Sequence, residues 1–312
     1  MSEVRPRRSV LYLPASNERA LEKAKTLPVD GLIFDLEDAV APDTKATARE
    51  LACAAAVSGA YGMRELTIRI NGLGTPWHDD DLAAACGAGP DGIVVPKVGS
   101  ADEVRTLVGA MEAAGAPQRT ALWAMIETPR AILEAAAIGS ASDRLTVFVL
   151  GTNDLVKELG TLTVQGRAPI HAALSLALLG ARAAGVAVLD GVYNDVRDPE
   201  GFEAECRQGR ELGFDGKTLI HPGQVETANR VFAPSAEDVE TARRTIAAFE
   251  AARAEGRAVA TLDGRLIESL HVEIAQRTVA MSEAVAVSPG ANGRESDRWR
   301  PDSPTSGTSP PR

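Results

Sequence analysis

The sequence contains few cysteines and histidines, and it has no long apolar run. Its 312 residues include three cysteines, an odd number, and no Cys-x-x-Cys pair. This usage indicates a reduced, cytoplasmic chain without a disulfide framework. The four histidines lack the His-Glu-x-x-His spacing of a zinc site. No apolar run approaches the roughly 18 residues that cross a membrane, so we expect no membrane partner.

Motifs of several large enzyme classes are also missing. The sequence has no G-x-x-x-x-G-K-[ST] phosphate loop and no G-x-S-x-G nucleophile elbow. Residues 87–92 match G-x-G-x-x-G, but they precede a predicted strand and contain Pro90, so we interpret them as a turn. The net charge of -10 argues against nucleic-acid binding. An anionic substrate would need locally clustered arginine and lysine.

What is present is a regular alternation of apolar strands and helices. Strands are predicted at residues 9–14, 31–37, 66–71, 92–97, 121–127, 146–154, 186–190 and 216–221. Eight such units predict an α/β fold, a (β/α)8 TIM barrel over residues 8–232. An open doubly wound sheet is the alternative, but it usually has fewer strands and a glycine-rich first turn.

The remaining segments flank this barrel. Residues 1–7 are an N-terminal arm, and residues 233–285 are a helical extension with helices at 236–256 and 267–284 and a turn at Asp263-Gly264. The extension is too small to stand alone, so it should pack on the barrel or on a neighbouring subunit. Residues 286–312 are rich in Pro, Ser, Gly and charge, which predicts a disordered tail.

Two of the apolar runs end on a carboxylate, Glu127 and Asp154, and residues 129–140 between them are predicted as a helix. A β-α-β unit gives neighbouring parallel strands, roughly 4.8 Å apart. Two carboxylates so placed repel each other unless a proton or a cation lies between them. A hard divalent cation suits such oxygen ligands. The alternative is two strand-end acids that cap loops or helices.

Other polar residues also follow apolar runs, where barrels carry their chemistry. They are Glu37, Asp38, Arg69, Lys97 and His221. Strand alternation points Arg69 inward, and a buried arginine needs an anionic partner. That partner is either Glu37 or Asp38, or a substrate carboxylate or developing oxyanion. Glu37 and Asp38 either hold metal-bound water or cap a helix, and His221 before Pro222 is interpreted as a hydrogen-bonded residue that begins a loop.

Near the first strand, Arg19 and Lys23 are four residues apart and share one helix face. Such a pair either binds phosphates or forms a solvated face. Tyr12, near the end of that strand, belongs either to the wall of a site or to the core.

Seven motifs then point to a family: FDLEDAVAP at 34–42, IRING at 68–72, VPK at 95–97, IET at 126–128, GTNDL at 151–155, DGVY at 190–193 and GFDGKTLIHP at 213–222. With them, residues 8 to about 284 resemble the citrate lyase β-subunit-like (HpcH/HpaI aldolase) superfamily of CoA-ester lyases. The wording of GTNDL and of DGVY with its following asparagine is most similar to the (3S)-malyl-CoA thioesterase and malyl- or citramalyl-CoA lyase branches.

The resemblance implies that Glu127 and Asp154 hold Mg2+, with Mn2+ as a substitute, and that Arg69 contacts the substrate together with Glu127. It also implies that Tyr12, Arg19 and Lys23 line the CoA arm of an acyl-CoA substrate. In the lyases an Ile-Asp motif from a neighbouring subunit supplies the catalytic base, which implies a homotrimer or a dimer of trimers. Here that position is Ile267-Glu268, a departure from the pattern.

The resemblance favours retro-Claisen cleavage of malyl-CoA or citramalyl-CoA, with Arg69 and Glu268 as catalytic residues and Glu37 and Asp38 in support. Hydrolysis of the thioester in the same site, with Glu268 as the base, is the alternative. A CoA-free 2-oxo-acid aldolase and a non-catalytic binding barrel are weaker alternatives.

Overall fold

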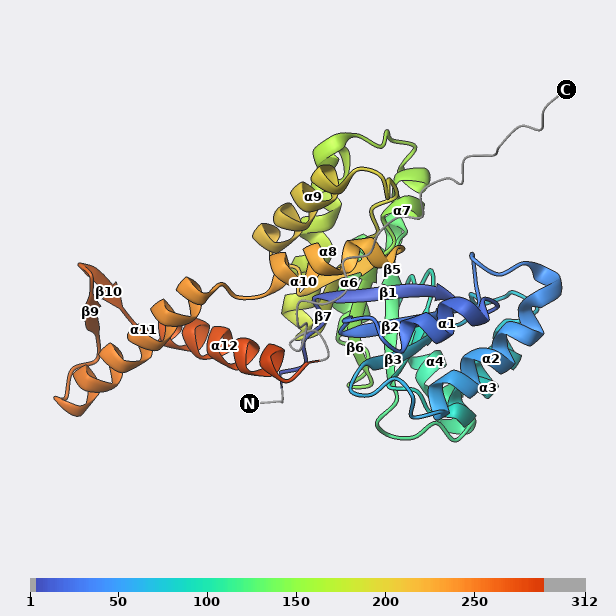
Figure 1. The fold of residues 1–312 in the computed structure, drawn as a ribbon, viewed down its shortest axis with the longest axis horizontal. Coiled ribbons are helices and arrows are strands. Elements are labelled where there is room, and N and C mark those ends of the chain that lie inside the picture. Colours follow the sequence, from blue (N-terminus) through green and yellow to red (C-terminus); the bar gives the residue numbers. More distant parts are fainter. Residues whose placement is uncertain (1–3, 289–312) are drawn as a thin grey trace, which may run out of the picture.

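Eight parallel strands close into a barrel in the computed structural model, which describes residues 4–288 (Figure 1). Each strand pairs with the next, and β1 pairs with β8. The predicted (β/α)8 barrel is therefore confirmed. The strands are β1 (Ser9–Pro14), β2 (Gly31–Asp35), β3 (Glu65–Arg69), β4 (Gly92–Val95), β5 (Ala121–Ile126), β6 (Leu145–Leu150), β7 (Ala187–Asp190) and β8 (Gly216–Leu219).

Helices surround the barrel, and some of the connections contain a short 3-10 turn. They are α1 (Glu18–Ala24), α2 (Lys45–Val57), α3 (His78–Ala88), α4 (Ala101–Ala113), α5 (Pro129–Leu133), α6 (Ala135–Gly139), α7 (Thr152–Leu159), α8 (His171–Ala184), α9 (Pro199–Leu212) and α10 (Val225–Phe232). The 3-10 turns are η1 (Pro42–Thr44), η2 (Gln165–Ile170) and η3 (Pro222–Gln224).

Two predicted elements need correction. The single helix expected at 129–140 is two helices, because Glu134 leaves the helical conformation at φ -96° and ψ 4°. The shift lets α6 pack closely on Gly180 of α8. The strand expected at 146–154 ends at Leu150, and α7 begins two residues later.

The barrel interior is filled with side chains and is not a pore. Alternate strand residues face inward, and the apolar ones form one buried cluster: Val10, Ile33, Val94, Trp123, Met125, Val147, Val149 and Leu189. At the amino end of the barrel, Arg7 Nε lies 2.6 Å from Glu65 Oε2 and its guanidinium lies over the Trp123 ring. Only the carboxyl ends of the strands are therefore left to form a site.

After α10 the chain forms an arm of α11 (Ala236–Ala254), the antiparallel strands β9 (Ala260–Leu262) and β10 (Arg265–Ile267), and α12 (Ser269–Ala286). Both predicted helices and the turn at Asp263-Gly264 are confirmed. The arm projects away from the barrel, with β9 and β10 at its far end (Figure 1). Its own apolar cluster is small and includes Ala252, Ala260, Ile267 and Val272.

The N-terminal segment packs on the barrel, where Arg7 pairs with Glu65. Residues 1–3 of the predicted N-terminal arm and 289–312 of the predicted disordered tail lie outside the described residues. Ala286, which the sequence assigned to the tail, is the last residue of α12. Within residues 4–288, none of the helices has both the length and the apolar character required to cross a membrane.

Candidate active site at the barrel mouth

Glu127 directly follows β5 and is buried at the mouth, with 2% of its surface exposed. Its Oε1 accepts a hydrogen bond from the backbone N–H of Lys97 at 2.8 Å. Lys97 adopts φ 54°, a left-handed conformation that a non-glycine residue rarely takes. On the other side, any side chain at Gly151 would collide with Glu127. The sequence around both loops is thus arranged to hold one carboxylate.

Asp154 lies in the first turn of α7 and not at a strand end as the sequence predicted. A carboxylate is favourable there because the helix dipole is positive at its amino terminus. Its Oδ1 lies 3.6 Å from Lys97 Nζ, and 26% of the side chain is exposed. The expected pairing of two acids at the mouth is kept, but a helix supplies the second one.

Burial raises the pKa of Glu127 to about 8, and the charges of Asp154 and Glu37 add to this effect. Glu127 therefore keeps a proton at neutral pH unless a cation replaces it. Among residues 4–288, no three or more His, Cys, Asp and Glu side chains are grouped to hold a metal. Two carboxylates suit Mg2+, which usually takes one or two protein carboxylates and fills its other positions with water or substrate.

Arg69 points into the mouth, as predicted, but its main partner is Asp35. Two bonds join them, Nε to Oδ1 at 2.6 Å and Nη2 to Oδ2 at 2.7 Å. The predicted partners are secondary: Nη1 lies 2.9 Å from Glu37 Oε2 and 3.3 Å from Asp38 Oδ2. Sequence reasoning missed Asp35, although it holds an inward position of β2 and pairs with Arg69 across the sheet.

Two neighbours of Arg69 have shifted pKa values. Burial raises the pKa of Glu37 to about 7, although Arg69 opposes this, so Glu37 can exchange a proton near neutral pH. Burial raises the pKa of Tyr12 well above its ordinary value, so its hydroxyl stays protonated. The Tyr12 ring lies 4.9 Å from the Arg69 guanidinium. Tyr12 is thus a wall of this mouth.

The remaining predicted residues lie in three different places. Arg19 and Lys23 are exposed on α1, and neither forms an ion pair within the part of the chain that the structure describes. Glu268 is the N-cap of α12, so within one chain it lies in the arm and not at the mouth (Figure 1). His221 Nδ1 accepts the N–H of Gly223 at 3.1 Å, which confirms its interpretation as a loop-start residue.

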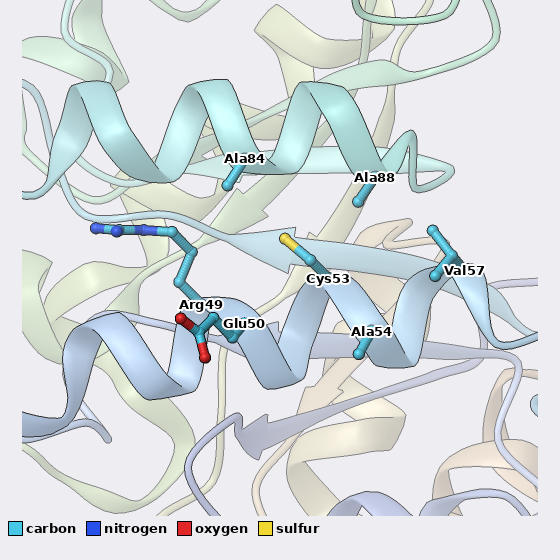
Figure 2. Close-up of a pocket in the computed structure, with 7 residues that line it drawn as sticks. All are labelled: Arg49, Glu50, Cys53, Ala54, Val57, Ala84 and Ala88. Atoms are coloured by element: carbon cyan, nitrogen blue, oxygen red, sulfur yellow. The ribbon is translucent and has the colours of Figure 1, made fainter.

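A separate groove of about 320 Å3 lies outside the barrel between α2 and α3 (Figure 2). Its lining includes Cys53, Val57, Ala84 and Ala88, with Arg49 at one end. Burial raises the pKa of the Cys53 thiol, which makes it a poor nucleophile. The groove lacks the paired carboxylates of the mouth, so we assign the chemistry to the mouth.

The chain is similar to a known enzyme family. A model described as HpcH/HpaI aldolase/citrate lyase matches residues 8–222. The chain belongs to this family. A (3S)-malyl-CoA thioesterase of Cereibacter sphaeroides (strain ATCC 17025) is 48% identical over 284 residues, covering 91% of this chain and 97% of that protein. An L-malyl-CoA/beta-methylmalyl-CoA lyase of the same strain is 36% identical, covering 90% and 96%.

A solved structure adds a ligand-bound relative. CitE from Mycobacterium tuberculosis, in complex with magnesium, acetoacetate and coenzyme A, superposes with a TM-score of 0.71. The two are 30% identical, and the match covers 88% of this chain and 97% of that one. The first two relatives are named as enzymes of malyl-CoA, and the CitE structure contains coenzyme A and magnesium. The paired carboxylates Glu127 and Asp154 at the mouth are of the kind that holds such a cation.

The pKa of Glu127 predicts a pH-dependent stability of the metal-free protein. The pKa of Glu127 is about 8 in the folded protein, against an ordinary value of 4.5 that applies to the unfolded chain. The protonated Glu127 side chain therefore contributes its full stability below pH 4.5, and this contribution is lost as the pH rises through 8. Glu127→Gln cannot ionise. In EDTA, denaturant titration should show the variant more stable than wild type at pH 9, by on the order of a few kcal/mol, and nearly equal at pH 4.

The exposed Glu112 on α4 offers a matched control, because Glu112→Gln should follow the wild-type pH profile. A wild-type profile that Glu127→Gln leaves unchanged would contradict the burial of an uncompensated carboxyl at this position.

Proposed function

We propose that this protein is a Mg2+-dependent enzyme that hydrolyses the thioester of (3S)-malyl-CoA to malate and free CoA. The pairing of buried Glu127 with Asp154 beside a fixed Arg69 carries the proposal, because it suits a metal-bound hydroxy acid. The 48% identity to a thioesterase over 91% of the chain favours C–S cleavage over the C–C cleavage first expected from the sequence. The lyase reaction remains the second candidate, favoured by the 36% identity to a lyase.

Glu127 and Asp154 would hold the metal. Bound Mg2+, or Mn2+ in its place, would supply Lewis-acid charge to the oxygens of the malyl group. Lys97 supports both ligands, since its N–H binds Glu127 and its ammonium lies near Asp154. The hydrogen bond fixes Glu127 before the substrate arrives, and the ammonium offsets part of the charge of Asp154.

Arg69 would stabilise negative charge that develops on the substrate. Asp35 occupies its Nε and Nη2, and Nη1 lies 2.9 Å from Glu37 Oε2. Substrate oxygens bound beside Glu37 would share this Nη1 donor. Because the guanidinium is already oriented, it needs little reorganisation during the reaction, and such preorganised charge is a major source of catalysis. The same property would serve either thioester hydrolysis or C–C cleavage.

The exposed cations Arg19 and Lys23 on α1 would bind the CoA phosphates. Tyr12 connects that region to the mouth, since its strand precedes α1 and its ring stacks on Arg69. A CoA-free aldolase would have no use for these two cations.

The arm would complete a neighbouring site. Leu266, Leu270 and Ile274 are each more than half exposed on it, and apolar side chains gathered outside a core mark interaction surfaces. We infer that the arm packs on a second copy in a homotrimer, or in a dimer of trimers, and delivers Glu268 there. Glu268 would take a proton from the attacking water while a C–O bond forms, the C–S bond breaks and CoA leaves as the thiolate.

Turnover of (3S)-malyl-CoA by the purified full-length protein tests this proposal. We expect malate and free CoA in equal amounts, inhibition by EDTA, and a loss of about 100-fold or more in kcat/KM for Asp154→Asn. Asp102→Asn, an exposed carboxylate on α4, serves as the control and should keep full activity. Formation of glyoxylate and acetyl-CoA would instead establish the lyase reaction. Absence of any turnover of malyl-CoA would reject both reactions.

Co-expression of two inactive variants tests whether Glu268 acts in another subunit. If Glu268→Gln and Asp154→Asn chains form mixed trimers, some sites will combine an intact Glu268 with an intact Asp154. Activity should then return to a fraction of wild type, whereas each variant alone stays inactive. Absence of recovery in isolated mixed trimers would contradict a shared site.

A further inference from the structure

The position of Asp154 depends on a short helix that has little support of its own. Helix α7 has eight residues, and Gly160 with φ 62° caps its carboxyl end. At the amino end, the N-cap Gly151 gives no side-chain cap. Only Thr152 and Leu155 are buried within it. The first turn, which carries Asp154, therefore needs contacts from elsewhere to hold its orientation.

Residues 191–194, which follow β7, supply those contacts. The side-chain amides of Asn153 and Asn194 bind each other reciprocally, with Nδ2 to Oδ1 distances of 3.2 Å and 2.7 Å. Beside this pair the backbone of Gly191 lies so close to Thr152 that any side chain at Gly191 would collide with it. Two adjacent residues of the α7 turn are thus held by one loop.

The loop is in turn anchored in a buried charge network outside the barrel wall. Asp190, at the end of β7, accepts hydrogen bonds from Arg167 Nη1 at 2.6 Å, from Lys217 Nζ at 2.9 Å and from the N–H of Gly191 at 2.8 Å. Asp190 and Lys217 are fully buried. Charged groups removed from water are held to their partners, because any departure leaves an uncompensated charge. The start of the loop is therefore rigid.

We propose that Asn194 is a positioning residue for the metal carboxylate: through Asn153 it holds the first turn of α7 so that Asp154 faces Glu127. This inference rests on the metal site of the proposed function. It differs from a direct role in catalysis or substrate binding, because Asn194 acts through Asn153 and not on the reacting atoms. The buried Asp190 provides the fixed end of this connection.

Asn194→Ala tests the proposal with two measurements on the metal-free full-length chain. In a Mg2+ titration by calorimetry, we expect about three- to tenfold weaker binding, because loss of a residue that orients a metal ligand commonly lowers metal affinity by this factor or more. In hydrogen exchange, the backbone amides of residues 152–158 should exchange faster. Arg197→Ala is the matched control, because Arg197 lies exposed in the same connection between β7 and α9 and its ion-pair partner is Asp195.

A double-mutant cycle separates the connection from a local effect. If Asn194 acts through Asn153, the double variant Asn153→Ala/Asn194→Ala should bind Mg2+ no more weakly than either single variant. The proposal is overturned if Asn194→Ala keeps wild-type affinity and exchange, or changes only the KM for malyl-CoA. A wild-type protein that does not bind Mg2+ would overturn the proposed function, while the exchange comparison would still decide whether the loop holds α7.

Discussion

An excess of negative charge at the barrel mouth is the constraint on which the rest of the structure depends. Five acidic side chains meet there: Asp35, Glu37, Asp38, Glu127 and Asp154. Among the described residues Arg69, Lys97 and the buried Lys45, whose Nζ lies 2.8 Å from the backbone oxygen of Glu37, oppose them, a formal balance of 3 - 5 = -2 when all are ionised. Asp35 and Arg69 neutralise each other by a bidentate pair. Glu127 is left buried beside Asp154, and burial, with the charges of Asp154 and Glu37 adding to it, raises its pKa to about 8. The fold holds a carboxyl that either a proton or a cation must compensate.

The same arrangement explains why the supporting elements have unusual local structure. Lys97 keeps a left-handed backbone, and Gly151 and Gly191 leave room where side chains would collide. Such strain persists only where surrounding contacts impose it, and it gathers at functional sites. Fixed carboxylates and a fixed guanidinium act together, because an oriented charge stabilises a transition state only if it does not reorganise.

Much of this could be predicted from the sequence. Eight apolar runs and the acids after them predicted the barrel and its mouth, because strand periodicity and the carboxyl-end rule are local signals. Asp154 was misplaced because the predicted strand was extended past Leu150, although the apolar residues stop there and the following Gly-Thr-Asn-Asp is typical of a loop or a helix start. Asp35 was missed, although the alternation along β2 could have shown that it faces Arg69. The site to which Glu268 contributes depends on how subunits associate, and no local sequence pattern encodes that association.

The proton balance of Mg2+ binding tests the central claim most directly. Calorimetric titrations at pH 7 in buffers of different ionisation enthalpy count the protons released as the metal binds. Because Glu127 holds a proton in the metal-free protein, we predict release of about one proton per Mg2+, falling toward zero above pH 9 and absent in Glu127→Gln. Mg2+ binding without proton release at pH 7 would contradict the account, as would the failure of Mg2+ to bind.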